Sequence, residues 1–537
     1  MLPCSAASRR ASLKALLTSG KGASAGRTSA KIEPFTRNLT RPLRTSINFR
    51  PIALLLLLTI GAILVHGFHP YVEDSEIYVP SAKRALDPAL YPTNNAFFLS
   101  HAHLTLFPNL IAESVRVTHL SWDWALFLWQ FASIFLLLWA CWRIGQLAFR
   151  DSLAAWGGAA LVGALLTIPV AGTALYIMDQ YVTTRALSTP ATLWVIVNTI
   201  ERRWVRAGFW LVFTVLIHPL MVVFCAAFMV LLVWLDRPQA TAVEPEPTFV
   251  TWLLMPLGFF PPVTDAYREI LQTRSYFLLQ RWEWYEWVGI FAPLILLEWF
   301  RRIAQKRDLP VLARLCAATI IFGLCFFVAG VVVSLPALEN FAELQPLRCL
   351  QLVYILLFLF AGGLLAQFVL KRAVWRWLVL FAPLCAGMLY AQRQLFPATA
   401  HVEWPHAASR NPWVQAFLWI RYNTPADAYF ALDPKFMLAA EEDQHGFRAI
   451  ANRSRMADRV KDSGAVSMFP QLAETWRTQV RSLDGWGSFK RQDFERLRQE
   501  YGVTWVVLQS KTLPDLPCPY QNSTVLVCRL DEGVASK

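Results

Sequence analysis

The residues best placed for chemistry are two adjacent acids, Glu73 and Asp74, which directly follow the first hydrophobic run. They lie in Phe68–Leu99, a stretch rich in aromatic residues and prolines that also contains Glu76 and Asp87. Carboxylates so close to a bilayer are costly to desolvate, which disfavours a pair without a role. We therefore interpret this loop as the wall of a reaction site at the outer membrane face. The alternative is a pair of solvated loop acids.

Four other connections on the same predicted side also carry polar side chains. Their sequences are MDQYVTTRALSTP, LIHPLMVVF, TDAYREILQTRSYFLLQRWEWYEW and ALENFAELQPLRCLQL. We expect residues from these connections to complete the site beside the acidic pair. The candidates are Asp179, Arg185, His218, Trp284, Glu343, Gln345 and Arg348.

Each of these residues also has a purely structural interpretation. Arg185 and Arg348 could extend from helix ends to the interface, as arginines there commonly do. Asp179 could pair with Arg185 alone, and His218 precedes a proline that suits a hairpin turn. The tryptophans around Trp284 suit an interfacial belt. The set of residues therefore carries more weight than any single member.

The composition predicts that these residues are positioned by a membrane domain. Hydrophobic residues make up 55% of the 537 residues and charged residues only 16%, too few to cover a soluble chain of this length. The 23 Trp and 36 Phe suit the interfacial belts of a polytopic protein. The net charge of +13 comes with basic residues placed between hydrophobic runs. The expected partner is therefore the lipid bilayer and not nucleic acid.

Eleven hydrophobic runs predict about eleven transmembrane helices. Several are near or below the roughly 17 residues that a span requires, so some must use interfacial residues or be broken helices. A further segment, His103–His119, is amphipathic and is expected to lie on the membrane surface. The expected spans are Pro51–Phe68, Asp123–Trp142, Ala154–Ile177, Ala186–Ile200, Ala207–Ile217, Leu220–Leu235, Phe249–Val263, Trp284–Phe300, Val311–Leu335, Leu350–Leu370 and Trp377–Leu395.

The distribution of basic residues predicts the orientation of these spans. With the N-terminus inside, four of the five inner connections are basic, and only Asp236–Thr248 is not. An odd number of spans then places the C-terminus outside. The basic residues of the inner connections are Arg143, Arg150, Arg202, Arg203, Arg206, Arg301, Arg302, Lys306, Arg307, Lys371, Arg372 and Arg376.

The two ends of the chain differ from its apolar middle, residues 51–397, whose first outer loop is 69–121. Residues 1–50 contain ten Lys and Arg and one acid, which predicts a disordered cytoplasmic arm, with a transit peptide as the alternative. Residues 398–537 have the composition of a soluble domain, which we predict to be a small α/β domain on the outer face.

Two strands and one helix are predicted within this C-terminal domain. Ala428–Leu432 and Val503–Gln509 are typical of strands, and Arg491–Tyr501 of an amphipathic helix that Gly502 ends. Cys518 and Cys528 flank a segment that can turn back on itself. In an oxidising compartment these two cysteines are expected to form a disulfide.

An acidic pair just after the first span resembles the GT-C superfamily of membrane glycosyltransferases, which includes protein O-mannosyltransferases and arabinosyl- and oligosaccharyltransferases. About eleven spans, a long first outer loop with a surface helix and an outer C-terminal domain are also similar to that superfamily. More narrowly, YFLLQRWEWYEW, AELQPLR and GFRAIANRSRMADRVKD resemble a bacterial group of GT-C-like integral membrane proteins. The resemblance covers about residues 50–510 and implies an enzyme of the bacterial inner membrane.

The resemblance also implies roles for the candidate residues. Asp74, or Glu73 beside it, would match the first-loop acid that activates the acceptor hydroxyl or helps to hold a divalent cation such as Mg²⁺ or Mn²⁺. A carboxylate suits inverting transfer, because the attacking oxygen needs a general base within hydrogen-bond reach. The donor would be a sugar linked to polyprenyl phosphate. Arg348 and Arg185 would stabilise the charge that develops on its phosphate.

Two other functions remain open at this point. A transporter or flippase of a lipid-linked sugar would favour ionisable residues at mid-membrane and two repeated halves. In this sequence the ionisable residues gather at the outer ends of the runs, and no repeat is apparent. A non-catalytic protein of envelope assembly would tolerate loss of the acidic pair, whereas an enzyme would not.

Overall fold

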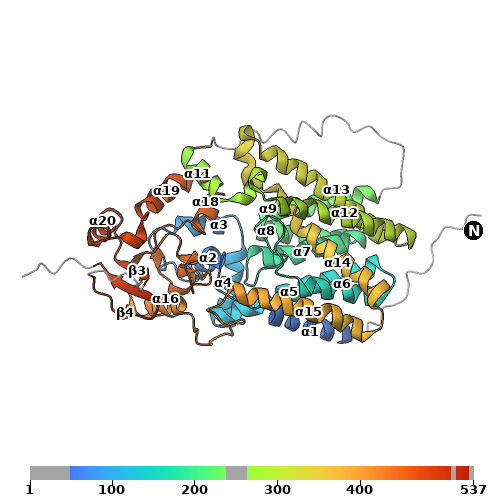
Figure 1. Ribbon diagram of the computed structural model, residues 1–537, viewed down its shortest axis with the longest axis horizontal. Coiled ribbons are helices and arrows are strands. Elements are labelled where there is room, and N and C mark those ends of the chain that lie inside the picture. Colours follow the sequence, from blue (N-terminus) through green and yellow to red (C-terminus); the bar gives the residue numbers. More distant parts are fainter. Residues whose placement is uncertain (1–48, 237–262, 510–515, 531–537) are drawn as a thin grey trace, which may run out of the picture. The chain divides into compact units, whose positions relative to one another are not determined.

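Helices dominate the first three quarters of the chain in the computed structural model, which describes residues 49–236, 263–509 and 516–530 (Figure 1). Short 3₁₀ turns lie at 275–281 and 336–349, and a π turn, Ala366–Leu370, extends α14. The helices are α1 Phe49–His66, α2 Ser75–Leu86, α3 Ala96–Ala102, α4 Phe107–Thr118, α5 Trp122–Ala148, α6 Ser152–Ala164, α7 Thr184–Ile200, α8 Trp204–Ile217, α9 Pro219–Leu235, α11 Asp265–Thr273, α12 Trp284–Lys306, α13 Pro310–Val333, α14 Leu350–Leu365 and α15 Val374–Leu395.

Five helices in the described residues are long and apolar enough to cross a membrane. They are α1, α5, α13, α15 and the continuous stretch Phe341–Leu370 that contains α14. Three shorter apolar helices, α6, α8 and α9, accompany them. The predicted helical membrane-type fold is confirmed at this level. The count of about eleven spans stays a prediction, and the expected span Phe249–Val263 lies outside the described residues.

The expected span Ala154–Ile177 is wrong in its second half, because α6 ends at Ala164. The chain after it folds into a hairpin, in which the Val170 amide donates to the Leu175 carbonyl at 2.8 Å. Pro169 explains the break, since proline offers no amide hydrogen and disfavours a helical residue before it. This hairpin brings the following connection, with Asp179, beside the first outer loop.

Close helix packing holds the apolar core together, most tightly where α6 meets α14. A Cβ atom on Gly157 would lie 2.6 Å from the Gly362 carbonyl oxygen, so the two backbones can approach this closely only through glycine. Small residues at such crossings are typical of helix pairs in membranes. The pairs α5–α6, α7–α8 and α12–α13 also pack against each other.

The C-terminal segment, residues 401–530, forms a five-stranded mixed sheet in the order β2-β1-β3-β5-β4. Strands β1, β2 and β3 are parallel, while β5 runs antiparallel to β3 and β4. The elements are α16 Pro412–Asn423, β1 Tyr429–Ala431, α17 Phe447–Ala451, β2 Ser454–Arg455, α18 Asp462–Val466, α19 Ala473–Ser482, α20 Arg491–Tyr501, β3 Trp505–Gln509, β4 Tyr520–Gln521 and β5 Val525–Arg529.

Alternation along β3 gives this sheet two buried faces. Trp505 and Val507 pack with α16 and α17, whereas Val506 and Leu508 pack with α20. Successive side chains of a strand point to opposite faces of the sheet, so a strand between two layers of helices needs apolar residues on both faces. The small α/β fold predicted for the C-terminal segment is thus present, and α20 has the predicted bounds.

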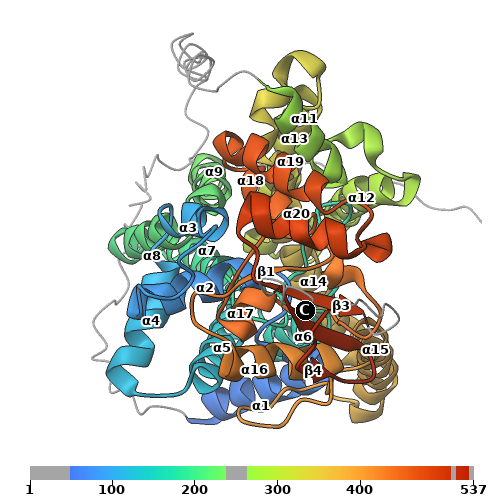
Figure 2. The ribbon, with the colours of Figure 1, turned by 90° about the vertical axis from the view of Figure 1, so that its left-hand side faces the viewer.

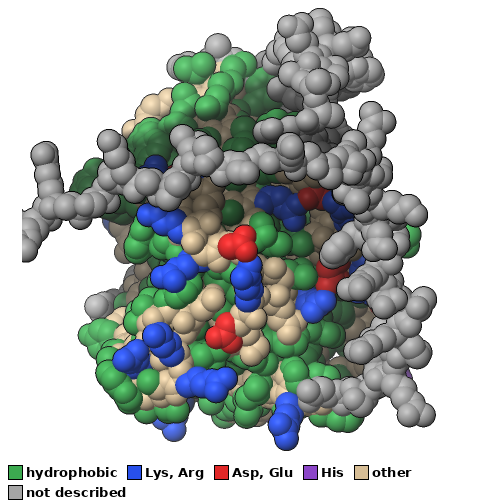
Figure 3. Space-filling view, turned by 90° about the vertical axis from the view of Figure 1, so that its right-hand side faces the viewer, with side chains coloured by type: hydrophobic (Ala, Val, Ile, Leu, Met, Phe, Trp, Pro, Cys, Tyr) green, Lys and Arg blue, Asp and Glu red, His purple; other side chains and the backbone are tan. Residues whose placement is uncertain are grey.

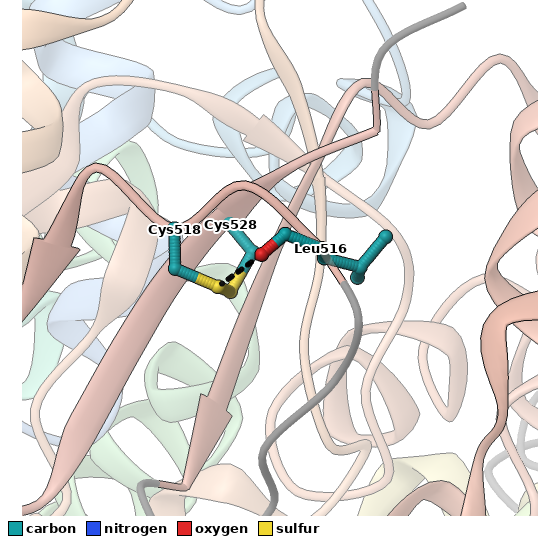
Figure 4. Close-up of a disulfide and its surroundings, with 3 residues drawn as sticks. All are labelled: Leu516, Cys518 and Cys528. Atoms are coloured by element: carbon teal, nitrogen blue, oxygen red, sulfur yellow. Dashed lines mark hydrogen bonds between the residues drawn. A yellow bond between two sulfur atoms is a disulfide. The ribbon is translucent and has the colours of Figure 1, made fainter. Parts of the chain in front are cut away.

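A disulfide joins Cys518 to Cys528 in the structure (Figure 4). Cys528 lies on β5 and Cys518 lies just before β4, so the bridge closes the hairpin that these two strands form. The helix α20 ends at Gly502, whose φ of 73° is the left-handed conformation that glycine adopts without strain.

The helices of the first loop lie beside the C-terminal segment (Figure 2). The helix α2 contacts α17, and α3 contacts α18. The short helix α11 packs on α18 and α19 from the other side. The segments that carry the candidate site residues are therefore brought together by elements that are far apart in the sequence.

Candidate active site

Backbone hydrogen bonds fix the acidic loop against the C-terminal segment. The Glu73 amide donates to the Gln444 carbonyl at 2.9 Å, and the Gly446 amide donates to the Tyr71 carbonyl at 2.7 Å. Glu73 has a φ of 54°, a left-handed conformation that is uncommon for a residue other than glycine and clusters at functional sites. A Cβ on Gly446 would lie 2.6 Å from the Glu76 carboxylate, so glycine is needed for this approach.

Two histidines and a glutamate hold the start of the same loop. His69 Nδ1 lies 2.9 Å from Glu403 Oε1, and His445 Nε2 lies 3.3 Å from the same oxygen. Burial would raise the pKa of Glu403, but its contacts with His445 and His69 outweigh burial and lower the pKa to about 2. Glu403 is therefore ionised across the physiological range and ties three distant segments together.

Asp74 is surrounded by cations. It occupies the N-cap position of α2, yet its carboxylate caps no amide of that helix. Instead its two oxygens lie 2.9 Å from Arg185 and 3.1 Å from Lys461 Nζ. Lys461 also forms an ion pair with Glu73, and Arg185 forms one with Asp179 at 2.9 Å. The carboxylate that would normally cap a helix is thus turned toward a cluster of charged side chains.

A fully buried network of charges lies behind this cluster. Its five members are at most 1% exposed and connect α2 with α17, β2 and α18. Burial would raise the pKa of one of them, Asp462, but Arg448 and Arg455 lower it. The network fixes α2, and with it Asp74, to the C-terminal segment. Its members are Glu76, Arg448, Arg455, Asp458 and Asp462.

Two cavities lie on either side of the charged cluster. The first has a volume of about 370 Å³ and reaches down to the hairpin between α8 and α9. The second, of about 340 Å³, lies over the hairpin that follows α6. Six residues line both cavities and so form their common wall: Asp74, Arg185, Arg274, Tyr276, Arg348 and Lys461.

Two arginines of this wall, Arg274 and Arg348, form no ion pair among the described residues. Arg274 donates hydrogen bonds to the Val460 carbonyl and to Ser463 Oγ, whereas the Arg348 guanidinium has no such hydrogen bond. In the described part of the chain the buried Nε of Arg348 has no hydrogen-bond partner, and the guanidinium lies 5.9 Å from the centre of the Tyr276 ring.

Three other buried atoms at the first cavity, His101 Nδ1, Arg274 Nε and Gln345 Oε1, also lack partners among the described residues. Unsatisfied buried polar groups are costly, so this wall is suited to a polar, anionic ligand.

Neutral histidine contributes to the same cavity. Burial lowers the pKa of His101 to about 4, so its imidazole is uncharged at neutral pH. Its free Nδ1 can then donate or accept a hydrogen bond, depending on the tautomer.

The structure brings most of the predicted site residues together. Asp74, Arg185 and Arg348 line both cavities. His218 and Gln345 line the first cavity, and Glu73 and Asp179 line the second. Two predicted residues, Trp284 and Glu343, line neither cavity.

Trp284 is 75% exposed in the first turn of α12, because this helix buries the face that carries Ile290, Leu294 and Leu297 instead. The structure thus places Trp284 outside both cavities, in an exposed position that suits an interfacial belt. Gln345, two residues after Glu343, adopts a left-handed φ of 44° and lines the first cavity, whereas Glu343 does not.

Lys461 was missed by sequence reasoning, although it lies within the motif GFRAIANRSRMADRVKD that carries the resemblance. Basic residues on a soluble domain usually face solvent, and the sequence does not show which of them is buried. His101 and Tyr276 were also missed, because nothing in their local sequence shows that they line the cavity. Arg274 was visible only as one of three arginines in an outer connection.

The charged cluster does not fit the divalent cation that the resemblance allows. Mg²⁺ and Mn²⁺ require several free oxygen ligands around one point. In the described residues no three His, Cys, Asp or Glu side chains are grouped in that way. The oxygens of Asp74 and Asp179 contact Arg185 and Lys461 instead. We derive no step through a metal ion.

Comparison with known proteins gives structural similarity alone. No family model matches the sequence, and no curated protein matches it. An oligosaccharyltransferase from Archaeoglobus fulgidus in the apo form matches with a TM-score of 0.48 and 11% identity, over 86% of this chain and 70% of that chain. The archaeal oligosaccharyltransferase AglB from Archaeoglobus fulgidus, in complex with an inhibitory peptide and a dolichol-phosphate, matches with 0.45 and 13% over the same shares.

Proposed function

We propose that this protein is a GT-C-type membrane glycosyltransferase that moves a sugar from a polyprenyl-phosphate-linked donor to an acceptor at the outer membrane face. One observation carries the proposal: Arg348, which has no carboxylate partner in residues 49–236, 263–509 and 516–530, lines the same two cavities as the acid Asp74. This wall offers a phosphate-binding group and a base to reactants that meet between the cavities.

The first cavity suits the lipid-linked donor. Its apolar part is formed by the hairpin of α8 and α9, and a prenyl chain can lie there between the two helices. The apolar residues of the hairpin that line the cavity are Ile217, Pro219, Leu220 and Val223. Arg348 and Arg185 lie at its polar end. Arginine can grip two phosphate oxygens at once, which favours it where charge develops on a leaving phosphate.

The second cavity suits the acceptor. Tyr176, Tyr181 and Asp179 line it beside the common wall, so its surface is more polar. In the proposed step the acceptor oxygen forms a bond to the anomeric carbon, and the bond from that carbon to the phosphate oxygen breaks. The acceptor proton passes to the Asp74 carboxylate, and the electron pair of the broken bond stays on the phosphate. Attack from the face opposite the leaving group inverts the anomeric centre.

The proposal includes the predicted topology, with about eleven spans, a cytoplasmic N-terminus and residues 69–121 and 398–537 outside. Figure 3 shows the end of the helices opposite the C-terminal segment, where Lys and Arg side chains are spread with few acids between them. This distribution supports an inner location for that end.

A cysteine-labelling scan tests this orientation at exposed positions. Cysteines at Ala89 and Ser488 are expected to react with a membrane-impermeant reagent in intact cells, and a cysteine at Gln305 only after permeabilisation. The reverse pattern, or labelling of all three only after permeabilisation, would contradict the proposed topology.

The donor site is tested by Arg348→Lys, which keeps one charge but loses the two-pronged contact. We expect kcat/KM for a lipid-phosphate sugar donor to fall roughly 10- to 100-fold, because a charge-assisted hydrogen bond is lost. Arg206→Lys, at an exposed position among the inner basic residues, serves as the control and should have no effect. Unchanged kinetics in Arg348→Lys would show that Arg348 does not bind the phosphate.

A further inference from the structure

Lys461 connects the C-terminal segment to the common wall of the two cavities. It precedes α18, and its side chain is 10% exposed. Its ammonium lies 3.1 Å from Asp74 Oδ1 and also forms an ion pair with Glu73. Lysines are almost never buried without a partner, and here the partners are the two acids of the first loop.

The backbone around Lys461 is held in place by one carboxylate. Asp458 Oδ1 accepts hydrogen bonds from the amides of Val460, Lys461 and Asp462 at 2.8, 2.6 and 3.0 Å. The other oxygen of Asp458 is bonded by Arg455. The turn that presents Lys461 is therefore rigid.

The same arginine fixes this turn to the helix that carries Asp74. Arg455 donates to Glu76 Oε1 at 2.9 Å, and Glu76 lies in the first turn of α2, two residues after Asp74. The Ala449 amide donates to the other Glu76 oxygen at 3.1 Å. The helix that carries Asp74 and the turn that carries Lys461 are thus both held by the buried side chain of Arg455.

Charge balance shows what Lys461 does in this position. Three carboxylates, those of Glu73, Asp74 and Asp179, are neutralised by two cations, Arg185 and Lys461. Without Lys461, Glu73 would lose its ion pair, and Asp74 would keep only the contact of Oδ2 with Arg185. Glu73 and Asp74 would then repel each other, and one oxygen of the Asp74 carboxylate would lose the contact that fixes its orientation.

We propose that Lys461 is a positioning residue of the transfer reaction: its ammonium bridges Glu73 and Asp74 and holds the Asp74 carboxylate at the wall between the two cavities. The inference rests on the proposed function, because it assigns the position of the proposed base. The outer segment thereby completes a site whose acids come from the first loop. Arg274 supports the same turn, since it donates to the Val460 carbonyl and to Ser463 Oγ.

The kinetic test uses Lys461→Met, which removes the charge and keeps the length of the side chain. We expect kcat to fall roughly 100-fold, as for a misplaced catalytic group, while KM for the lipid donor stays nearly constant. Lys461→Arg keeps the charge and should recover part of the loss. Lys435→Met, at an exposed position of the same segment, is the matched control and should behave as wild type.

A second readout separates positioning from folding. In Lys461→Ala, added ethylammonium should restore part of kcat, because a small cation can occupy the space of the missing ammonium. A structural role would give a lower melting temperature without such rescue. Wild-type kcat in Lys461→Met, or a loss that tracks melting temperature and is not rescued, would overturn the inference.

A double-mutant cycle distinguishes failure of this inference from failure of the proposed function. Melting temperatures of Lys461→Met, Asp74→Asn and the double variant report coupling between the two side chains without any transfer assay. If wild type transfers no sugar from any lipid-phosphate donor, the proposed function fails. Coupling would then still show that Lys461 holds Asp74, and additive effects would show that it does not.

Discussion

Asp74→Asn is expected to lower the turnover of sugar transfer by roughly 10²- to 10⁴-fold, because the amide cannot take the acceptor proton. The fold should survive the change. The Asp74 carboxylate caps no helix amide, so no cap is lost, and an asparagine oxygen can still accept a hydrogen bond from Arg185. The variant thus removes the base and keeps most of its surroundings.

The assay is transfer from a lipid-phosphate sugar by purified variants, with thermal stability measured in parallel. Asp87→Asn, at the exposed end of the same helix, is the control and should retain full activity. Glu73→Gln should have a milder effect, since Glu73 lines only the second cavity and is paired with Lys461. Full activity in both Asp74→Asn and Glu73→Gln would exclude the loop as the catalytic centre.

Arg455→Met is expected to destabilise the C-terminal segment by about 3–5 kcal/mol, the usual cost of leaving buried charges without their partner. Arg455 is 1% exposed and forms ion pairs with Glu76, Asp458 and Asp462. Methionine fills much of the same space, so the lost charge is the main cause of the effect. The expected cost corresponds to an equilibrium constant for opening that is roughly 10²- to 10⁴-fold larger.

Hydrogen–deuterium exchange across residues 447–466 measures this opening directly. Arg459→Met is the matched control four residues away, because Arg459 pairs with the half-exposed Asp484. An exposed pair contributes at most about 1 kcal/mol. Equal protection in the two variants would show that the buried network contributes no more than a surface ion pair.

Hydrophobic runs predicted most of the helices because the pattern of a membrane helix is local. The end of α6 was missed because residues up to Ile177 are mostly apolar, although Pro169 is a local signal for the break. The hairpin that follows also packs against Trp282, which lies far away in the sequence. The strands β2 and β4 have two residues each and exist only through their pairing with β1 and β5. Nothing local in the sequence specifies such strands.

The site shows the same division between local and distant information. Asp74 and Arg348 were predictable because a charge beside an apolar run is conspicuous. Lys461 was not, since its role depends on a turn that meets the first loop only in the folded chain. Trp284 shows the converse case, in which a conspicuous residue near the membrane lies on an exposed helix face.

The buried network also has a consequence for the order of biosynthesis. Glu76 and Arg455 are 379 residues apart in the sequence, and both are inaccessible to water once they meet. The first loop, although made early, cannot bury its acid until the ribosome has delivered the matching arginine. A partly made chain would therefore insert its early helices with an open and inactive outer loop. Transfer activity would begin only when the C-terminal segment packs on the first loop. A defect in that packing would therefore leave protein that is inserted in the membrane but inactive.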